Sequence, residues 1–303
     1  MTDAQTSAPR PNIFVVGGSK CGTTSLYRML QLADGIGTSN TRKELHYFSA
    51  PEIVQRLAAP GDEGVAKLVL RDEADYLAEF SHLPADMANI VDVSPSYLQN
   101  PQVPARIRDF APEARIVIFL RNPVGKVFSQ YVHLWSSGQE TLPFEEAFDK
   151  STERREAAYS PMWDYRSGGF YAGHLRRYLD LFGKDRVRVE IFEEFFGPDP
   201  VAQNGLADFM GIRFAEGPPP KINVSGRVKS PLMKAVLGNS ALKGAFRTLV
   251  PLSLRDRLSG AIRGSVQTEK PKISDVMRAR LEDLYRDDVA EVEAILGRRI
   301  GWF

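Results

Sequence analysis

An apolar strand that runs into a glycine-rich loop and then a helix constrains this sequence more than any other stretch. Residues 12–26 read NIFVVGGSKCGTTSL, with an apolar run first and helical spacing from Thr23 onward. Glycines let backbone N–H groups turn toward one point, and a helix N-terminus adds partial positive charge. Lys20 and the hydroxyls of Thr23 and Thr24 supply further donors. The stretch therefore predicts an anion-binding loop over residues 17–22, called the anion loop below.

The residue order in the anion loop indicates which anion it binds. An ATP or GTP loop places its lysine after the last glycine, whereas Lys20 here precedes Gly22 and threonines follow. The order G-x-K-x-G-T-T resembles the 5′-phosphosulfate loop of sulfotransferases that use 3′-phosphoadenosine 5′-phosphosulfate (PAPS). A turn without a ligand is the alternative for this stretch alone. The resemblance implies that the following residues bind the cofactor: Ser19, Lys20, Cys21, Gly22, Thr23, Thr24 and Ser25.

Composition excludes several classes of protein. The 303 residues are 43% hydrophobic and 25% charged, enough to bury a sizeable core, and the net charge of +1 argues against a protein that coats nucleic acid. Cys21 is the single cysteine, so no intramolecular disulfide can form; it is either a packing residue or a reactive thiol.

Residues 1–11 lack the apolar core of a signal peptide, and no run reaches the ~18–20 apolar residues of a membrane span. We expect a flexible N-terminus and a cytoplasmic protein.

A candidate base follows the first predicted helix. Residues 41–48 read TRKELHYF, and Glu44 and His46 lie two apart, so in an extended segment they point the same way. This stretch resembles the E-x-H-F-F segment of carbohydrate sulfotransferases of the heparan sulfate type. The resemblance implies catalytic roles for Lys20, Glu44 and His46, with Glu44 as the base that deprotonates the acceptor. A surface Lys-Glu pair beside a half-buried histidine is the alternative.

A second short strand is expected near residues 89–93, followed by a turn. Its apolar run ends in Asp92, which could be a metal-binding acid, and this is the best support for a nucleotide triphosphatase. The S-P-x-Y segment that follows resembles one lining the acceptor cleft of sulfotransferases, which implies that Ser94 and Tyr97 bind substrate. Glycan-modifying members often carry a lysine before this serine. Val93 stands here, so a helper cation is either missing or supplied from elsewhere, with Lys43 as the candidate.

The run ARIVIFLRNP over residues 114–123 predicts a central parallel strand that ends in Arg121 and a helix that starts at Pro123. In the family this pattern holds the 3′-phosphate, which implies that Arg121 and Ser129 do so here. A further strand, expected over residues 186–195, resembles one whose aromatic residue stacks on adenine. Phe192 takes that place, although a core phenylalanine is the common alternative.

A basic stretch near the C-terminus has two readings. Residues 221–263 contain nine basic residues and one acid, a net charge of +8. They form either a solvated lid or a contact for an anionic membrane surface or acceptor. The resemblance implies that Arg227 and Lys229 cover the cofactor, within a closing insertion over residues 217–272.

These patterns favour one three-layer α/β domain over residues 12–303, with a P-loop-like, mostly parallel sheet. The resemblance implies transfer of a sulfuryl group from PAPS to a hydroxyl of a glycan, glycolipid or glycosylated small molecule, with 3′,5′-ADP as product and no metal. Among these acceptors, we expect a lipid-linked or small one at the cytoplasmic face of the membrane. The alternatives are a magnesium-dependent nucleoside triphosphate kinase and a non-catalytic module that binds PAPS or its product.

Overall fold

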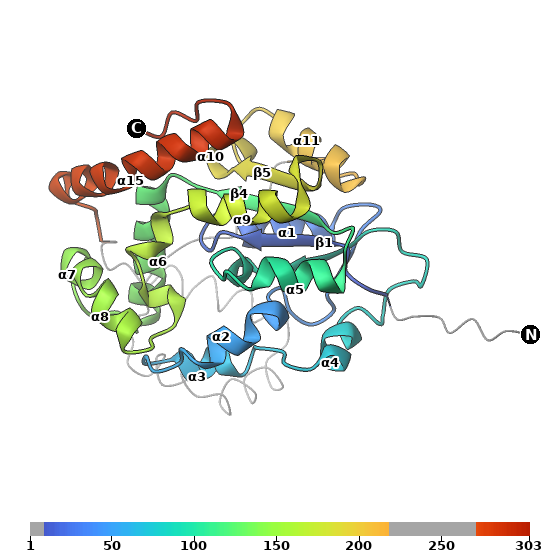
Figure 1. Ribbon diagram of the computed structural model, residues 1–303, viewed down its shortest axis with the longest axis horizontal. Coiled ribbons are helices and arrows are strands. Elements are labelled where there is room, and N and C mark those ends of the chain that lie inside the picture. The colour runs from blue at the N-terminus through green and yellow to red at the C-terminus, as the bar shows by residue number, and fades with distance from the viewer. Residues whose placement is uncertain (1–8, 218–270) are drawn as a thin grey trace, which may run out of the picture.

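The computed structural model describes residues 9–217 and 271–303 (Figure 1). Within them the chain forms a parallel sheet with helices on both faces, which confirms the predicted three-layer α/β fold. The strand order is β2-β3-β1-β4-β5. The strands are β1 (Ile13–Gly17), β2 (Gly37–Thr38), β3 (Ile90–Val93), β4 (Arg115–Leu120) and β5 (Val187–Ile191).

The helices before β4 are α1 (Thr23–Gln31), η1 (Tyr47–Ser49), α2 (Ala50–Val54), α3 (Asp62–Ala66), α4 (Glu73–Ala78), η2 (Pro95–Tyr97) and α5 (Val103–Phe110). Between β4 and β5 lie α6 (Pro123–Ser137), α7 (Phe144–Asp149), α8 (Ser151–Glu156), η3 (Pro161–Trp163), η4 (Ser167–Gly169), α9 (Ala172–Phe182) and η5 (Lys184–Arg186). After β5 come α10 (Phe192–Phe195), α11 (Val201–Met210) and α15 (Asp275–Leu296).

Strand β1 is apolar throughout because helices cover both faces of the sheet. Ile13 and Val15 pack with α1 and α11, whereas Phe14 and Val16 pack with α5 and α9 on the opposite face (Figure 1). All four side chains are buried. Successive side chains of a strand point to opposite faces, so a strand buried on both sides reads as one continuous apolar run.

The predicted strand over residues 186–195 is too long. Strand β5 ends at Ile191, which pairs with Leu120, the last residue of β4. Beyond Leu120 the neighbouring strand offers no further backbone partner, and the chain turns into α10 at Phe192. Phe192 therefore begins a short helix instead of lying inside a strand.

Parallel strands bring the predicted functional loops to one edge of the sheet. The anion loop follows β1, and Arg121 follows β4, which lies directly beside β1. Ligands of open α/β sheets bind beyond the carboxyl ends of the strands. Arg227, Lys229 and the basic stretch 221–263 lie outside the described residues, so the closing insertion stays a prediction. Of the helices that are described, none is long and apolar enough to cross a membrane.

Candidate active site

The anion loop has a backbone that requires glycine at residue 22. Gly22 caps α1 with a φ of 86°, in the left-handed region that side chains rarely adopt. A Cβ atom there would lie 2.4 Å from the Phe196 ring and 2.8 Å from the Phe192 ring. The loop thus packs against these two aromatic rings, and a larger residue would push it away from them.

Three cations converge on the anion loop. Lys43 Nζ lies 3.1 Å from Thr23 Oγ1 and 3.5 Å from Thr24 Oγ1. Arg121 Nη1 donates to the Lys20 carbonyl oxygen at 3.2 Å. Burial lowers the pKa of Lys20, and the charges of Lys43 and Arg121 lower it further. Like charges gathered in a partly buried loop stabilise a bound anion.

Arg121 keeps a buried donor that no residue in the described part of the chain satisfies. Its Nε atom has no hydrogen-bond partner there, and its guanidinium lies 4.5 Å from the centre of the Phe192 ring. Gly125, in the first turn of α6, lies beside this atom: a Cβ at that position would be in ordinary van der Waals contact with Nε, at 3.6 Å. An unsatisfied buried guanidinium donor suits a phosphate, which accepts charged hydrogen bonds in a fork. Arg121 covers one face of Phe192, so an adenine ring could stack only on the other.

Three residues on one face of α6 follow Arg121 and extend the candidate site. Gly125, Ser129 and His133 are spaced by four residues, so they follow one another along the same face of the helix. Burial lowers the pKa of His133; the Lys20 charge lowers it further and the Glu44 charge raises it. His133 therefore lies within electrostatic reach of both groups, and the sequence analysis missed it. Its four-residue spacing from Ser129 is the signal that could have revealed it.

Glu44 and His46 come together as predicted. Glu44 Oε1 lies 2.5 Å from Lys43 Nζ, and Glu44 Oε2 lies 3.6 Å from His46 Nε2. Burial raises the pKa of Glu44, but the charges of Lys43 and His46 outweigh this and leave the pKa below its usual value. Burial lowers the pKa of His46, whose Nδ1 lies 2.8 Å from Ser96 Oγ. At neutral pH Glu44 is therefore deprotonated, the form in which a carboxylate can accept a proton, and it lies beside a neutral imidazole.

Ser94 and Tyr97, which the sequence interpretation assigned to substrate binding, lie in the core of the structure. Both side chains are fully buried, and both donate to the carboxylate of Asp92. Tyr76 donates to the same carboxylate, so Asp92 is bound by three hydroxyls within the core. Burial raises the pKa of Asp92 to about 6, although these hydroxyls lower it. Asp92 is thus a core residue and does not project toward the nucleotide loop as a metal-binding acid would.

Cys21 is a packing residue. Its side chain is fully buried, and its Sγ lies 3.7 Å from the Ser19 carbonyl oxygen. Burial raises the pKa of the thiol to about 11, so it is not a thiolate at neutral pH. Ser19, in the anion loop, and Ser25, in the first turn of α1, are partly exposed. Across residues 9–217 and 271–303, no group of three His, Cys, Asp or Glu side chains could hold a metal ion.

Contacts from distant segments support the Arg121 end of the site. The Tyr171 hydroxyl donates to the Arg121 carbonyl oxygen at 2.9 Å. Asn122 caps α6 by accepting from Val124 N and also donates to the Trp302 carbonyl oxygen at 3.2 Å. The C-terminal residues therefore help to hold the turn that carries Arg121.

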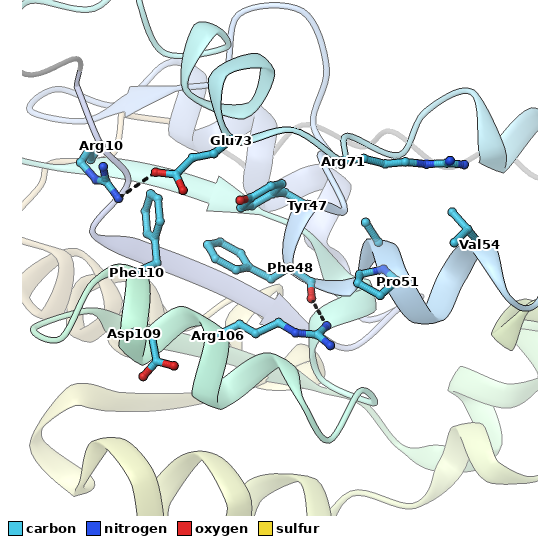
Figure 2. Close-up of a pocket in the computed structure, with 11 residues that line it drawn as sticks. Arg10, Tyr47, Phe48, Pro51, Val54, Arg71, Glu73, Arg106, Asp109 and Phe110 are labelled. Carbon is cyan, nitrogen blue, oxygen red and sulfur yellow. Dashed lines mark hydrogen bonds and ion pairs between the residues drawn. The ribbon is translucent and has the colours of Figure 1, made fainter.

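A separate cleft of about 570 Å³ opens beside Tyr47 and Phe48 (Figure 2). Arg10 precedes β1 and Phe110 precedes β4, so this cleft extends toward the amino ends of the strands, away from the anion loop. Arg10 also forms an ion pair with Glu73 at 3.3 Å. Because it lies away from the converging cations, the cleft is not the candidate active site.

This chain is similar in sequence and in fold to known proteins. A family model described as "Sulfotransferase family" matches residues 11–215. The crystal structure of a sulfotransferase from Alicyclobacillus acidocaldarius is 32% identical and superposes with a TM-score of 0.76, covering 97% of this chain and 99% of that one.

Two human relatives are more distant. The bifunctional heparan sulfate N-deacetylase/N-sulfotransferase 2 is 22% identical over 211 residues, and the match covers 67% of this chain but 22% of the relative. Heparan sulfate glucosamine 3-O-sulfotransferase 3B1 is 23% identical over 204 residues, and the match covers 67% of this chain and 46% of the relative. The chain therefore corresponds to less than half of either human protein.

Proposed function

This chain belongs to the sulfotransferase family, and we propose that it transfers a sulfuryl group from PAPS to a hydroxyl of a glycan, glycolipid or glycosylated small molecule. The observation that carries the proposal is the position of Lys43. Its ammonium contacts Thr23, the first residue of α1 after the anion loop, at 3.1 Å and Glu44 at 2.5 Å, so one side chain joins the anion site to the candidate base.

The residues of the site fit PAPS. Lys20 with the hydroxyls of Thr23 and Thr24 would hold the 5′-phosphosulfate, and Arg121 with Ser129 would hold the 3′-phosphate. The unsatisfied Nε of Arg121 and the converging cations support this assignment. When bound, PAPS supplies an activated sulfuryl group together with a leaving group, 3′,5′-ADP. Positioning and charge stabilisation then dominate the protein's contribution to rate.

Glu44 would take the proton of the acceptor. A neutral hydroxyl is a poor nucleophile, and a positioned carboxylate contributes roughly 10²–10⁴ in rate. His46 and His133 would help to orient Glu44 or the acceptor. The acceptor class is supported by the human relatives, whose names specify heparan sulfate and its glucosamine. One of those names specifies N-sulfation, so an amine acceptor is the competing outcome.

The first test is binding. Calorimetry with 3′,5′-ADP, 5′-AMP and ATP, each with and without Mg²⁺, should show tight metal-independent binding of 3′,5′-ADP only. A preference for ATP with Mg²⁺ would instead support the kinase.

The second test is turnover with PAPS on a panel of glucosamine oligosaccharides, a glycolipid and a simple phenol, with products identified by mass spectrometry. Glu44→Gln should lose roughly 10²–10⁴ in kcat and still bind 3′,5′-ADP. Glu63→Gln is the matched control, because Glu63 is an exposed residue of α3. Binding of 3′,5′-ADP without turnover on any acceptor would favour the non-catalytic module.

A further inference from the structure

A buried carboxylate connects strand β3 to the turn that carries Glu44. Asp92 is fully buried and accepts from three hydroxyls. Its Oδ1 accepts from Ser94 Oγ at 2.6 Å, and its Oδ2 accepts from Tyr97 at 2.8 Å and Tyr76 at 3.0 Å. The two oxygens thus accept from different donors, and among the side chains that the structure describes Ser94 alone donates to Oδ1.

Ser94 in turn accepts hydrogen bonds from the backbone next to Glu44. Its Oγ accepts from the amide of Leu45 at 3.1 Å and from the amide of His46 at 3.4 Å. A serine hydroxyl has one proton and two lone pairs. Because the Ser94 hydroxyl donates its one proton to the hydrogen bond with Asp92, both lone pairs of Ser94 are left for the two amides. A carboxylate at residue 92 therefore fixes which way the Ser94 hydroxyl points.

The turn needs this support because its backbone is strained. His46 has a φ of 57°, in the left-handed region that residues other than glycine seldom adopt. Such conformations persist only where surrounding contacts hold them, and they concentrate at functional sites. On the other side of the turn, the His46 carbonyl oxygen accepts from Ser49 N at 3.1 Å and Ser49 Oγ at 3.2 Å. Hydrogen bonds thus hold the residue from both its amide and its carbonyl.

From these contacts we propose that Asp92 and Ser94 are positioning residues that hold the Glu44–His46 turn in its reactive geometry. The inference rests on the proposed function, in which Glu44 is the base. Neither residue touches the acceptor. They act through the amides of Leu45 and His46, and so set where the Glu44 carboxylate lies relative to Lys43 and the anion loop.

Ser94→Ala tests the connection, with Tyr76→Phe as the matched control. Tyr76→Phe removes a hydroxyl from the same carboxylate but leaves the path from Oδ1 through Ser94 intact. Ser94→Ala should lower kcat roughly tenfold to hundredfold, since a shift of ~1 Å can cost that much. Its Kd for 3′,5′-ADP should stay within about twofold of wild type. Tyr76→Phe should keep kcat within about twofold, even if both variants lose similar thermal stability.

Amide hydrogen exchange gives a readout that does not depend on turnover. The Leu45 and His46 amides should exchange faster in Ser94→Ala and at the wild-type rate in Tyr76→Phe. Should Ser94→Ala fail to fold, Ser94→Cys replaces the hydroxyl with a weaker hydrogen-bonding thiol of similar size and should shift both readouts in the same direction. Equal loss of kcat in Ser94→Ala and Tyr76→Phe, or unchanged exchange at Leu45 and His46, would overturn the proposal.

The two proposals fail in distinguishable ways. If wild-type protein turns over no acceptor but the exchange difference appears, Glu44 is not a base although Ser94 still holds its turn. If wild type is active and the exchange difference is absent, the proposed function stands and the positioning role fails.

Discussion

The ammonium of Lys43 lies 2.5 Å from a carboxylate oxygen of Glu44, and the same ammonium contacts Thr23 in the first turn of α1. Lys43 precedes Glu44 directly, so the cation and the carboxylate are held by one short stretch of backbone. This arrangement couples the charge state of the candidate base to the anion site. It also predicts how the pH dependence of turnover should respond to loss of the cation.

Replacing Lys43 by methionine should move the acidic limb of the pH profile to higher pH. Burial raises the pKa of Glu44 and Lys43 is the main group that lowers it, so removal of the ammonium leaves burial less opposed. A base must be deprotonated to act, and the profile of kcat/KM against pH reports this pKa in the free enzyme. Lys43→Arg keeps the charge and should keep the limb near its wild-type position. An unshifted limb in Lys43→Met would mean that Glu44 is not the titrating base.

Arg121→Ala should weaken binding of 3′,5′-ADP by roughly tenfold to hundredfold, the range expected for hydrogen bonds to a charged group. The affinity for 5′-AMP, which lacks the 3′-phosphate, should change much less. Calorimetry with both nucleotides measures the difference. Arg121→Lys should recover only part of the loss, because a lysine ammonium cannot form the planar fork of a guanidinium. Equal losses for the two nucleotides would place Arg121 elsewhere than at the 3′-phosphate.

Gly22→Ala should destabilise the protein by about 1–3 kcal/mol, from the left-handed backbone together with the contact with Phe192 and Phe196. Binding of 3′,5′-ADP should weaken as well, because the anion loop must move away from the two rings. Gly173→Ala is the matched control: Gly173 lies in α9, and a Cβ there would meet nothing within 4 Å. That change should leave stability equal or raise it by about 0.4–1 kcal/mol. Thermal melts of the two variants measure the contrast.

Local patterns were sufficient to predict the parts of the fold that surround the anion loop. The apolar run before Gly17 and the one before Arg121 are strands β1 and β4, and they are neighbours in the sheet. Asn122 and Pro123 start α6 as expected, with the Asn122 side chain accepting from Val124 N and Gly125 N. These signals lie within a few residues of the structure they specify, so sequence alone reveals them.

Side-chain roles that depend on distant partners could not be predicted. Ser94 and Tyr97 are buried because Asp92 and Tyr76, from β3 and α4, meet in the core. No spacing in the sequence shows that meeting. The end of β5 likewise depends on where β4 stops, which local apolar character at Phe192 and Phe195 does not reveal. Local patterns therefore predicted the strands and the helix start around the loops, but not which side chains behind them are buried.

His174 should make the protein less stable as the pH falls from about 6.5 toward 4. Its Nδ1 contacts the guanidinium of Arg177, and burial together with the Arg177 charge lowers its pKa from 6.5 to about 4. A histidine whose pKa is lowered in the folded state binds protons more readily in the unfolded state. Its contribution to stability is therefore complete above about pH 6.5 and is lost as the pH falls through the folded pKa. The loss is on the order of 1–3 kcal/mol.

His174→Gln keeps a hydrogen-bond acceptor that does not titrate, so its melting temperature should fall less than that of wild type between pH 7 and 4.5. His82→Gln, at an exposed position, is the matched control and should follow the wild-type curve. Thermal melts at half-unit pH intervals measure the three curves. If His174→Gln and wild type lose stability in parallel, the acid sensitivity arises from other groups. The pKa of His174 in the folded protein is then lowered less than its burial indicates.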